Sequence, residues 1–231
     1  MTDIRAVIFD MDGCLVDSEP MSLATLAELM AAEGLETTMD ELRRKFLGVS
    51  IQSIVSHIAK ALDRDDLPDF ARDFQDRLLA RYPTELRVIP GIPALLDDLA
   101  ARGIAVAIAT GSSVHRLGMT LQVAGLADRF GANTFSADQV ARGKPAPDLF
   151  LLAAERLGIP ADACAVMEDS PHGIVGARAA GMRAVGFTGG SHLSGIQADH
   201  ARRLSEAGAV AVLPGLDGLL DALLDHQPTG V

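Results

Sequence analysis

From Leu86 onward, short apolar runs alternate with turn residues and with segments of helical period. The clearest apolar runs are residues 104–109, 163–167, 184–187 and 209–213. Each has the length of a buried strand and is too short for a typical helix. Repeated units of strand, loop and helix build a parallel sheet with helices on both faces. The pattern therefore predicts an α/β fold with a Rossmann-like parallel sheet.

One more apolar run, residues 6–9, lies far upstream and is β-branched or aromatic at three of its four positions. The intervening segment shows apolar stripes of helical period and no convincing strand. We expect residues 1–16 and 86–231 to form the core domain and residues 17–85 to form an inserted helical cap domain. An insert that directly follows a catalytic loop is well placed to act as a lid.

Two aspartates, Asp10 and Asp12, follow the first predicted strand at once, and Gly13 lets the chain turn after them. In open α/β sheets, ligands bind beyond the carboxyl ends of the strands. Two carboxylates this close repel each other, and a hard divalent cation such as Mg²⁺ would relieve that repulsion with oxygen ligands. The alternative is a strand that ends in a solvated, aspartate-rich turn.

Polar groups of other kinds follow the later strands. Thr110, Gly111 and Ser112 offer a hydroxyl and an unhindered backbone at a helix start, which suits an anion. The same three residues also make an ordinary helix cap. Lys144 lies just before Pro145 and suits pairing with a buried anion, although a lone loop lysine is usually solvated.

A second acidic pair, Glu168 and Asp169, ends the strand predicted at residues 163–167. The alternative is that Asp169 or Ser170 simply caps the helix that follows. Because parallel strands end at one edge of a sheet, we expect this pair to lie near Asp10.

Taken together, these groups are what phosphoryl transfer through an aspartate requires. Asp10 would be the nucleophile, and Asp12 would protonate the leaving alcohol and later activate water. A metal bound by Asp10, the carbonyl of Asp12 and Asp169 would cancel the repulsion between carboxylate and phosphate, with help from Lys144. The segment of Thr110, Gly111 and Ser112 would hold the phosphate oxygens.

The four segments occur in an order and spacing that resemble the haloacid dehalogenase-like superfamily, in its branch of beta-phosphoglucomutases and small sugar-phosphate phosphatases. The segments are Asp10 to Glu19, Thr110 to Ser112, Lys144 to Asp148 and Glu168 to Gly173. The resemblance covers nearly the whole chain and implies a Rossmann-like core with a helical cap, magnesium as cofactor, and the roles given above. It also implies that Glu168 adjusts the metal site. One departure is Cys14, where the family commonly has threonine.

The reaction type follows from two comparisons with that family. Dehalogenases lack the second acid, so Asp12 speaks against dehalogenation. Mutases known to have this fold resemble the chain but carry arginine where it has Ile51 and histidine where it has Ser22. Our first choice is a magnesium-dependent phosphatase that hydrolyses a small phosphorylated sugar or polyol through an aspartyl-phosphate. The alternatives are a beta-phosphoglucomutase-type mutase and, less favoured, a catalytically inactive binding protein.

Substrate contacts from the cap are predicted at four positions: Glu19, Lys45, Ser50 and Gln52. Their alternative is an ordinary solvated position. The only partner expected is a small phosphorylated metabolite.

A formal net charge of −11 argues against binding to nucleic acid or to anionic membranes. Two cysteines make neither a disulfide framework nor a metal quartet. The sequence shows no signal peptide and no apolar run near ~18 residues. We therefore expect a cytoplasmic protein, with a monomer as the default state.

Overall fold

The computed structural model describes residues 3–47, 49 and 51–224. The chain divides into two compact units. The core unit comprises Met1–Asp17 and Val88–Val231, and the helical unit comprises Ser18–Arg87.

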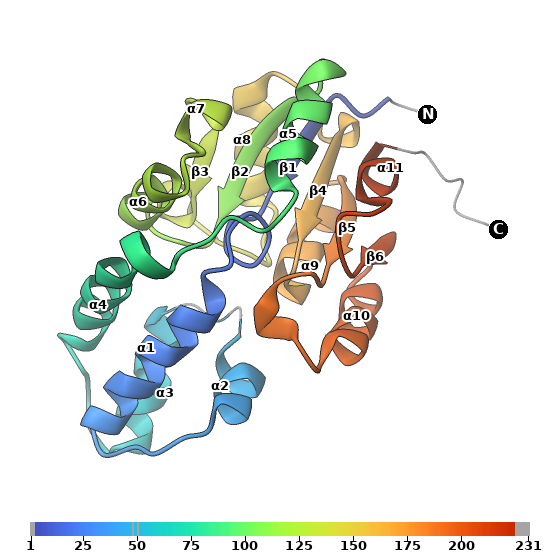
Figure 1. The fold of residues 1–231 in the computed structure, drawn as a ribbon. Helices are drawn as coiled ribbons and strands as arrows, with labels where there is room; N and C mark the ends of the chain where they lie inside the picture. Colours follow the sequence, from blue (N-terminus) through green and yellow to red (C-terminus); the bar gives the residue numbers. More distant parts are fainter. Residues whose placement is uncertain (1–2, 48, 50, 225–231) are drawn as a thin grey trace. The chain divides into compact units, whose positions relative to one another are not determined.

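A six-stranded sheet forms the centre of the core unit, with strand order β3-β2-β1-β4-β5-β6 (Figure 1). Every neighbouring pair of strands is parallel, which confirms the predicted α/β fold. The strands are β1 (Ala6–Phe9), β2 (Ala105–Thr110), β3 (Thr134–Ser136), β4 (Cys164–Glu168), β5 (Arg183–Phe187) and β6 (Ala211–Leu213).

Helices cover both faces of this sheet (Figure 1). One face packs against α8, α9 and α10, in an apolar cluster that includes Ile8, Phe150 and Ile174. The other face packs against α5, α7 and α11, where the Phe9 and Phe130 rings meet edge to face. The helices of the core unit are α5 (Ile92–Ala101), α6 (Val114–Ala124), α7 (Ala127–Phe130), α8 (Asp148–Leu157), α9 (Pro171–Ala179), α10 (Gln197–Glu206) and α11 (Leu219–Leu224).

Burial on both faces explains why β1 is apolar at every position and why β2 and β4 are apolar up to their last residues, Thr110 and Glu168. All four residues of β1 are fully buried, and the strand lies between β2 and β4. Phe9 is in register with Ile108 on one side and Met167 on the other. The residue after Phe9 therefore lies beside the ends of β2 and β4.

Strand β3 was not predicted from the sequence. It has only three residues, two of them hydroxylated, and it lies at the edge of the sheet beside β2. Such a short polar segment carries no periodic signal of its own, since its pairing with Ile108 to Thr110 creates the strand.

The helical unit contains α1 (Glu19–Ala32), α2 (Met39–Phe46), α3 (Ile51–Ala61) and α4 (Phe70–Glu85). The apolar stripes of α1 and α4 pack against each other, with Leu26 and Tyr82 almost completely buried. Helix α2 is short and mostly charged, and it begins with a capping box in which Thr38 and Glu41 satisfy each other's backbone N–H groups. Among the described residues of either unit, no helix is both long and apolar enough to cross a membrane.

Candidate active site

A tight loop carries Asp10 and Asp12 away from the end of β1. The Asp10 N–H donates to the Met167 carbonyl, which continues the sheet by one residue. Gly13 then adopts a φ of +76°, a left-handed conformation that favours glycine. A side chain at this position would overlap the Asp169 carboxylate and the His192 ring. The glycine thus lets this loop pack directly against the acidic end of β4.

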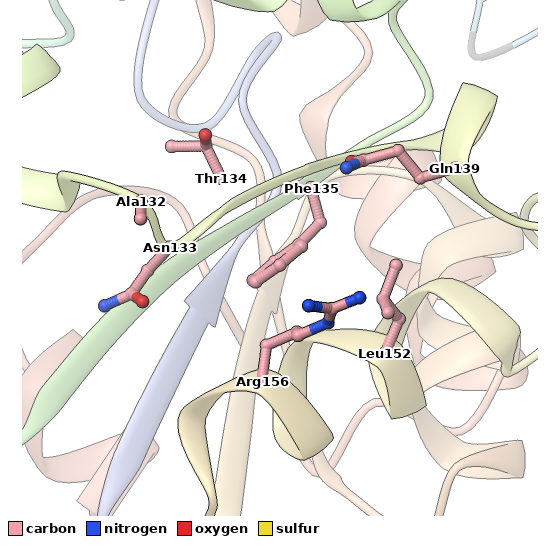
Figure 2. Close-up of a pocket in the computed structure, with 7 residues that line it drawn as sticks. All are labelled: Ala132, Asn133, Thr134, Phe135, Gln139, Leu152 and Arg156. Atoms are coloured by element: carbon pink, nitrogen blue, oxygen red, sulfur yellow. The ribbon is translucent and has the colours of Figure 1, made fainter.

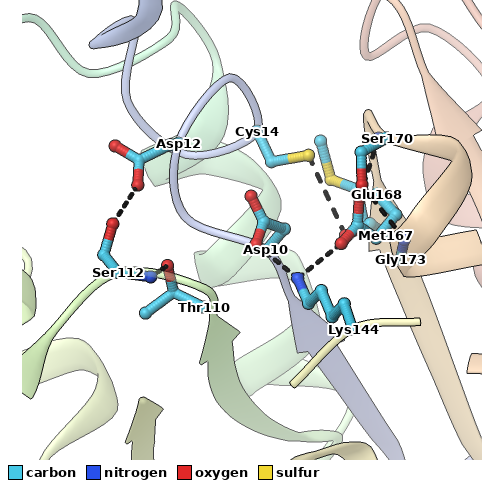
Figure 3. A network of polar contacts seen from close by, with 10 residues as sticks. All are labelled: Asp10, Asp12, Cys14, Thr110, Ser112, Lys144, Met167, Glu168, Ser170 and Gly173. Carbon is cyan, nitrogen blue, oxygen red and sulfur yellow. Dashed lines mark hydrogen bonds and ion pairs between the residues drawn. The ribbon is translucent and has the colours of Figure 1, made fainter. Parts of the chain in front are cut away.

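Asp10 and Glu168 share a buried lysine (Figure 3). The Lys144 Nζ donates to Asp10 Oδ1 and to Glu168 Oε1, at 2.5 Å each. The same nitrogen lies 5.2 Å from the centre of the Phe150 ring, which adds a cation–π contact. Lys144 therefore pairs with buried acids, as the sequence predicted: Asp10 directly follows β1, and Glu168 is the last residue of β4.

Burial and charge act in opposite directions on this cluster. Desolvation raises the pKa of Asp10 well above its usual value, although the Lys144 charge works against that shift. Burial also raises the pKa of Asp169, and the Glu168 carboxylate adds to the effect. For Lys144, burial opposes the charge, but the Asp10 and Glu168 carboxylates outweigh it and raise the pKa. The site thus holds more negative charge than its lysine neutralises.

Asp12 points to the opposite side of the loop, toward the first turn of α6. Its Oδ2 accepts a hydrogen bond of 2.7 Å from the Ser112 hydroxyl (Figure 3). Its Oδ1 forms an ion pair with Arg116, also at 2.7 Å. The Asp12 side chain is only 12% exposed, and the Arg116 side chain is only 15% exposed. Arg116 was not predicted from the sequence, and it brings a second cation to the site.

The predicted anion cradle has a different local structure from the one expected. Helix α6 begins at Val114, and its cap is Ser113, which accepts from the Arg116 N–H. The Ser112 N–H donates to the Thr110 hydroxyl. The Ser112 side chain therefore contacts Asp12. Gly111 is exposed, and a Cβ atom added there would have no neighbouring atom within 4 Å.

Asp169 is flanked by two buried histidines from the segment that follows β5. Nε2 of His192 lies 3.1 Å from Asp169 Oδ2, and Nε2 of His200 lies 2.6 Å from the backbone oxygen of the same residue. Neither histidine was predicted. Ser170, not Asp169, caps helix α9, because its hydroxyl accepts from the Gly173 N–H.

The donor set fits a hard divalent cation. Ligand atoms of Asp10, Cys14 and Asp169 lie within 4.8 Å of one another. The Cys14 thiol faces the Met167 carbonyl, and burial raises its pKa well above the usual value, so it stays protonated. The Asp10 and Asp169 carboxylates are buried and only partly neutralised by Lys144. Carboxylate oxygens of this kind are the ligands that Mg²⁺ takes. Glu168 lies outside this group and contacts Lys144 and Ser170 instead.

The predicted cap residues belong to the helical unit. Glu19 begins α1, Lys45 is an exposed residue of α2, and Gln52 is an exposed residue of α3. Ser50 lies outside the described residues. Glu19, Lys45 and Gln52 are therefore described as part of the helical unit, and their contact with substrate stays a prediction.

A separate hollow of about 340 Å³ lies at the β3 edge of the core unit (Figure 2). Phe135 and Asn133 line it from the strand side, and Leu152 and Arg156 line it from α8. None of the acids described above contributes to it. The acidic cluster at the ends of β1 and β4 is therefore the candidate site, and this hollow is not part of it.

Comparisons with known proteins agree with the geometry. The family model "haloacid dehalogenase-like hydrolase" matches residues 4–181. A phosphorylated carbohydrates phosphatase from Thermotoga maritima is 31% identical over 211 residues, which cover 91% of this chain and 94% of that protein. Protein SUPPRESSOR OF QUENCHING 1 from Arabidopsis thaliana is 33% identical over 186 residues, which cover 79% of this chain but only 18% of that protein.

Solved structures are similar along almost the whole chain. A HAD family hydrolase from Deinococcus radiodurans R1, with bound phosphate and sodium, is 33% identical with a TM-score of 0.76 and covers 98% of this chain and 100% of its own. A putative beta-phosphoglucomutase from Thermotoga maritima is 29% identical with a TM-score of 0.73, and the match covers 95% of this chain and 98% of that one.

Proposed function

The chain belongs to the haloacid dehalogenase-like hydrolases, and we propose that it is a magnesium-dependent phosphatase acting on a small phosphorylated sugar or polyol. The activity is hydrolysis of a phosphoric monoester through an aspartyl-phosphate at Asp10. One observation carries the proposal: Asp10 and Asp12 leave the same strand end but have different partners. Asp10 is bound by a buried lysine, whereas Asp12 is held apart by Ser112 and Arg116.

The two aspartates are assigned two different chemical roles. In the first step, an Asp10 oxygen forms a bond to phosphorus while the bond from phosphorus to the leaving oxygen breaks. Asp12, once protonated and released from its ion pair with Arg116, donates the proton that the leaving oxygen needs, so a neutral alcohol departs. Lys144 lies against the attacking carboxylate and offsets the negative charge that gathers on the phosphoryl oxygens.

The second step reverses the proton transfer. Water attacks the phosphorus, Asp12 takes its proton, and the bond from phosphorus to the Asp10 oxygen breaks. Inorganic phosphate leaves and the Asp10 carboxylate is restored. Mg²⁺, held by Asp10, Asp169 and the Asp12 carbonyl, would supply positive charge to the phosphoryl oxygens in both steps.

The helical unit, Ser18–Arg87, is proposed to be the cap that selects the substrate. Its position in the chain supports this role, because it is inserted directly after the loop that carries the two aspartates. Glu19, Lys45, Ser50 and Gln52 stay the candidate contacts. That the protein works in the cytoplasm as a monomer also stays a prediction.

A mutase is the second candidate, and the solved putative beta-phosphoglucomutase is consistent with it. A mutase has to hold a second phosphate with cationic groups. This chain has Ile51 and Ser22 where the mutases described above carry arginine and histidine. An inactive binding protein is less favoured still, because both aspartates, the lysine and Asp169 are present together.

A panel of sugar and polyol phosphates, assayed for phosphate release with Mg²⁺, tests the proposal. We expect release from at least one member, its loss on chelation of the metal, and its abolition in Asp10→Asn. The matched control is Asp97→Asn, since Asp97 is a surface residue that pairs with Arg129. Isomerisation of β-glucose 1-phosphate to glucose 6-phosphate, primed with the 1,6-bisphosphate, would instead show a mutase.

A further inference from the structure

Ser136 carries a buried hydroxyl that has no part in the phosphoryl transfer described above. It is the last residue of β3 and is completely buried. Its hydroxyl donates a hydrogen bond of 2.6 Å to the backbone carbonyl of Ser112. Ser112 is the residue whose own hydroxyl donates to Asp12 (Figure 3). Two successive hydrogen bonds, joined through Ser112, therefore connect the edge strand to Asp12.

Helix capping accounts for only part of these contacts. Ser136 is the N-cap of the short 3₁₀ helix Ala137–Gln139, and in that role its hydroxyl oxygen accepts from the Asp138 N–H at 3.1 Å. A cap uses a lone pair of the hydroxyl and leaves its proton available. That proton goes to Ser112, a residue 24 positions away in the chain. The hydroxyl of Ser136 therefore also joins β3 to the loop that follows β2.

The Ser112 carbonyl belongs to a loop just outside α6. The hydrogen-bond ladder of this helix begins one residue later, at the carbonyl of Ser113. Asp138 makes a second connection to the same loop, because its Oδ2 accepts from the Val114 N–H at 2.9 Å. The end of β3 and the turn after it thus contact the loop at two points, one on each side of the helix cap.

Asp12 needs a fixed contact of this kind during turnover. Its Oδ1 has to leave Arg116 before it can give a proton to the leaving oxygen. The Ser112 hydroxyl contacts the other oxygen, Oδ2, so this bond can persist while Oδ1 changes partners. An error of about 1 Å in the position of a catalytic group can lower a rate by about 100-fold. The placement of Ser112 therefore bears directly on proton transfer by Asp12.

We propose that Ser136 is a positioning residue for Asp12. It fixes the Ser112 carbonyl, and so keeps the Ser112 hydroxyl where it orients the Asp12 carboxyl group toward the leaving oxygen. Asp138 supports the same loop from an exposed position. This inference rests on the proposed phosphatase function and adds to it a residue that acts through another one. Without the Ser136 hydroxyl the loop relaxes, and proton donation is impaired more than phosphoryl transfer itself.

The test compares two phosphate esters of similar shape that need an acid to different degrees. Phenol is a poorer leaving group than p-nitrophenol, so hydrolysis of phenyl phosphate depends more strongly on a proton from Asp12. The readout is kcat/KM for phenyl phosphate divided by kcat/KM for p-nitrophenyl phosphate, which reports the step in which the alcohol departs. Ser136→Ala is expected to lower this ratio about tenfold. Thr134→Ala, in the same strand, is the matched control and should keep it.

A double substitution tests whether Ser136 acts through Ser112. In a Ser112→Ala background, Ser136→Ala should leave the ratio unchanged, because the hydrogen bond to Asp12 is already lost. Asp138→Ala alters an exposed residue and should lower the ratio by a smaller factor. An equal loss of kcat/KM for both esters in Ser136→Ala would show a purely structural role and overturn the proposal. Additive effects of the Ser112 and Ser136 substitutions on the ratio would overturn it as well.

Amide hydrogen exchange distinguishes failure of this inference from failure of the proposed function. In Ser136→Ala, the amides of residues 111–116 should exchange about threefold or more faster than in Thr134→Ala, because the loop has lost one hydrogen bond. Faster exchange in a protein that hydrolyses neither ester would overturn the phosphatase assignment and the catalytic part of this proposal, and only the hold on the loop would stand. Hydrolysis of both esters with unchanged exchange and an unchanged ratio would overturn the role of Ser136 and leave the phosphatase assignment intact.

Discussion

Gly173→Ala changes a residue that packs directly against the candidate site. Gly173 lies in the first turn of α9, and a methyl group there would overlap both oxygens and the carboxyl carbon of Glu168. In an ordinary helix, replacing glycine by alanine stabilises the protein by up to about 1 kcal/mol. Here we expect the opposite sign, because the Glu168 carboxylate has to move away from its partners.

The magnitude follows from those partners. Glu168 accepts hydrogen bonds from Lys144 Nζ at 2.5 Å, from the Ser170 N–H at 2.8 Å and from the Ser170 hydroxyl at 2.9 Å. Each bond to a charged group contributes about 1.5–3 kcal/mol. Loss of one of them, offset by a gain of about 1 kcal/mol in helix propensity, leaves a net destabilisation of about 0.5–2 kcal/mol. For a chain of this size that lowers Tm by about 1–8 °C. Displacement of Lys144 along with Glu168 should also lower kcat by about 10–100-fold.

Thermal unfolding and steady-state kinetics measure both effects. Gly118→Ala on α6 is the control, because no atom lies within 4 Å of its new methyl group, and it should be as stable as the wild type or more so. In a Glu168→Ala background the methyl group has room, so Gly173→Ala should no longer destabilise the protein. The reasoning is refuted if Gly173→Ala is as stable and as active as the wild type, or if Glu168→Ala does not relieve its effect.

Three shorter predictions concern other contacts. Lys144→Met should lower turnover by about 100-fold or more, because a group that stabilises the transition-state charge is lost. Lys60→Met in the helical unit is the control and should not lower turnover. Equal kinetics for the two variants would contradict the role of Lys144. His192→Phe should weaken Mn²⁺ binding about 10–100-fold in an EPR titration of the resting protein, since it loses its contact with Asp169, and unchanged affinity would make His192 a packing residue only. Burial and the Asp162 carboxylate raise the pKa of Cys164 to about 11 from 9.0, so the folded state binds this proton more tightly than the unfolded state. Its contribution to stability is full below pH ~9 and is lost as the pH rises through ~11, and Cys164→Ala should flatten the fall in Tm over that range; an unaltered slope would show that the thiol does not titrate there.

Much of the site could be predicted because parallel strands end at one edge of the sheet. Asp10 follows β1 and Glu168 ends β4, and the parallel register of these two strands brings them together around Lys144. The apolar runs were long enough to identify five of the six strands, and the alternation with helices fixed their direction. The metal-binding role assigned to Glu168 stays a prediction, since its carboxylate contacts Lys144 and Ser170 in this structure.

The contacts that were missed depend on side chains returning from helices and loops. Arg116 reaches Asp12 from the first turn of α6, and nothing in the spacing of the two residues indicates that contact. Its signal was electrostatic, because a cation at the start of a helix needs a nearby acid. The sequence contained a weaker indication of His192. It lies just after two glycines, and a side chain at one of them, Gly190, would overlap the His192 ring.

The central claim is that Asp10 carries the phosphoryl group during turnover. The direct measurement quenches the reaction with acid, reduces the protein with borohydride and locates homoserine by peptide mass spectrometry, because borohydride reduces an acyl phosphate to the alcohol. We predict homoserine at position 10 in the wild type with substrate and Mg²⁺, and none in its absence. Phosphate release without homoserine at position 10, or homoserine at Asp12 or Asp169 instead, would contradict the account.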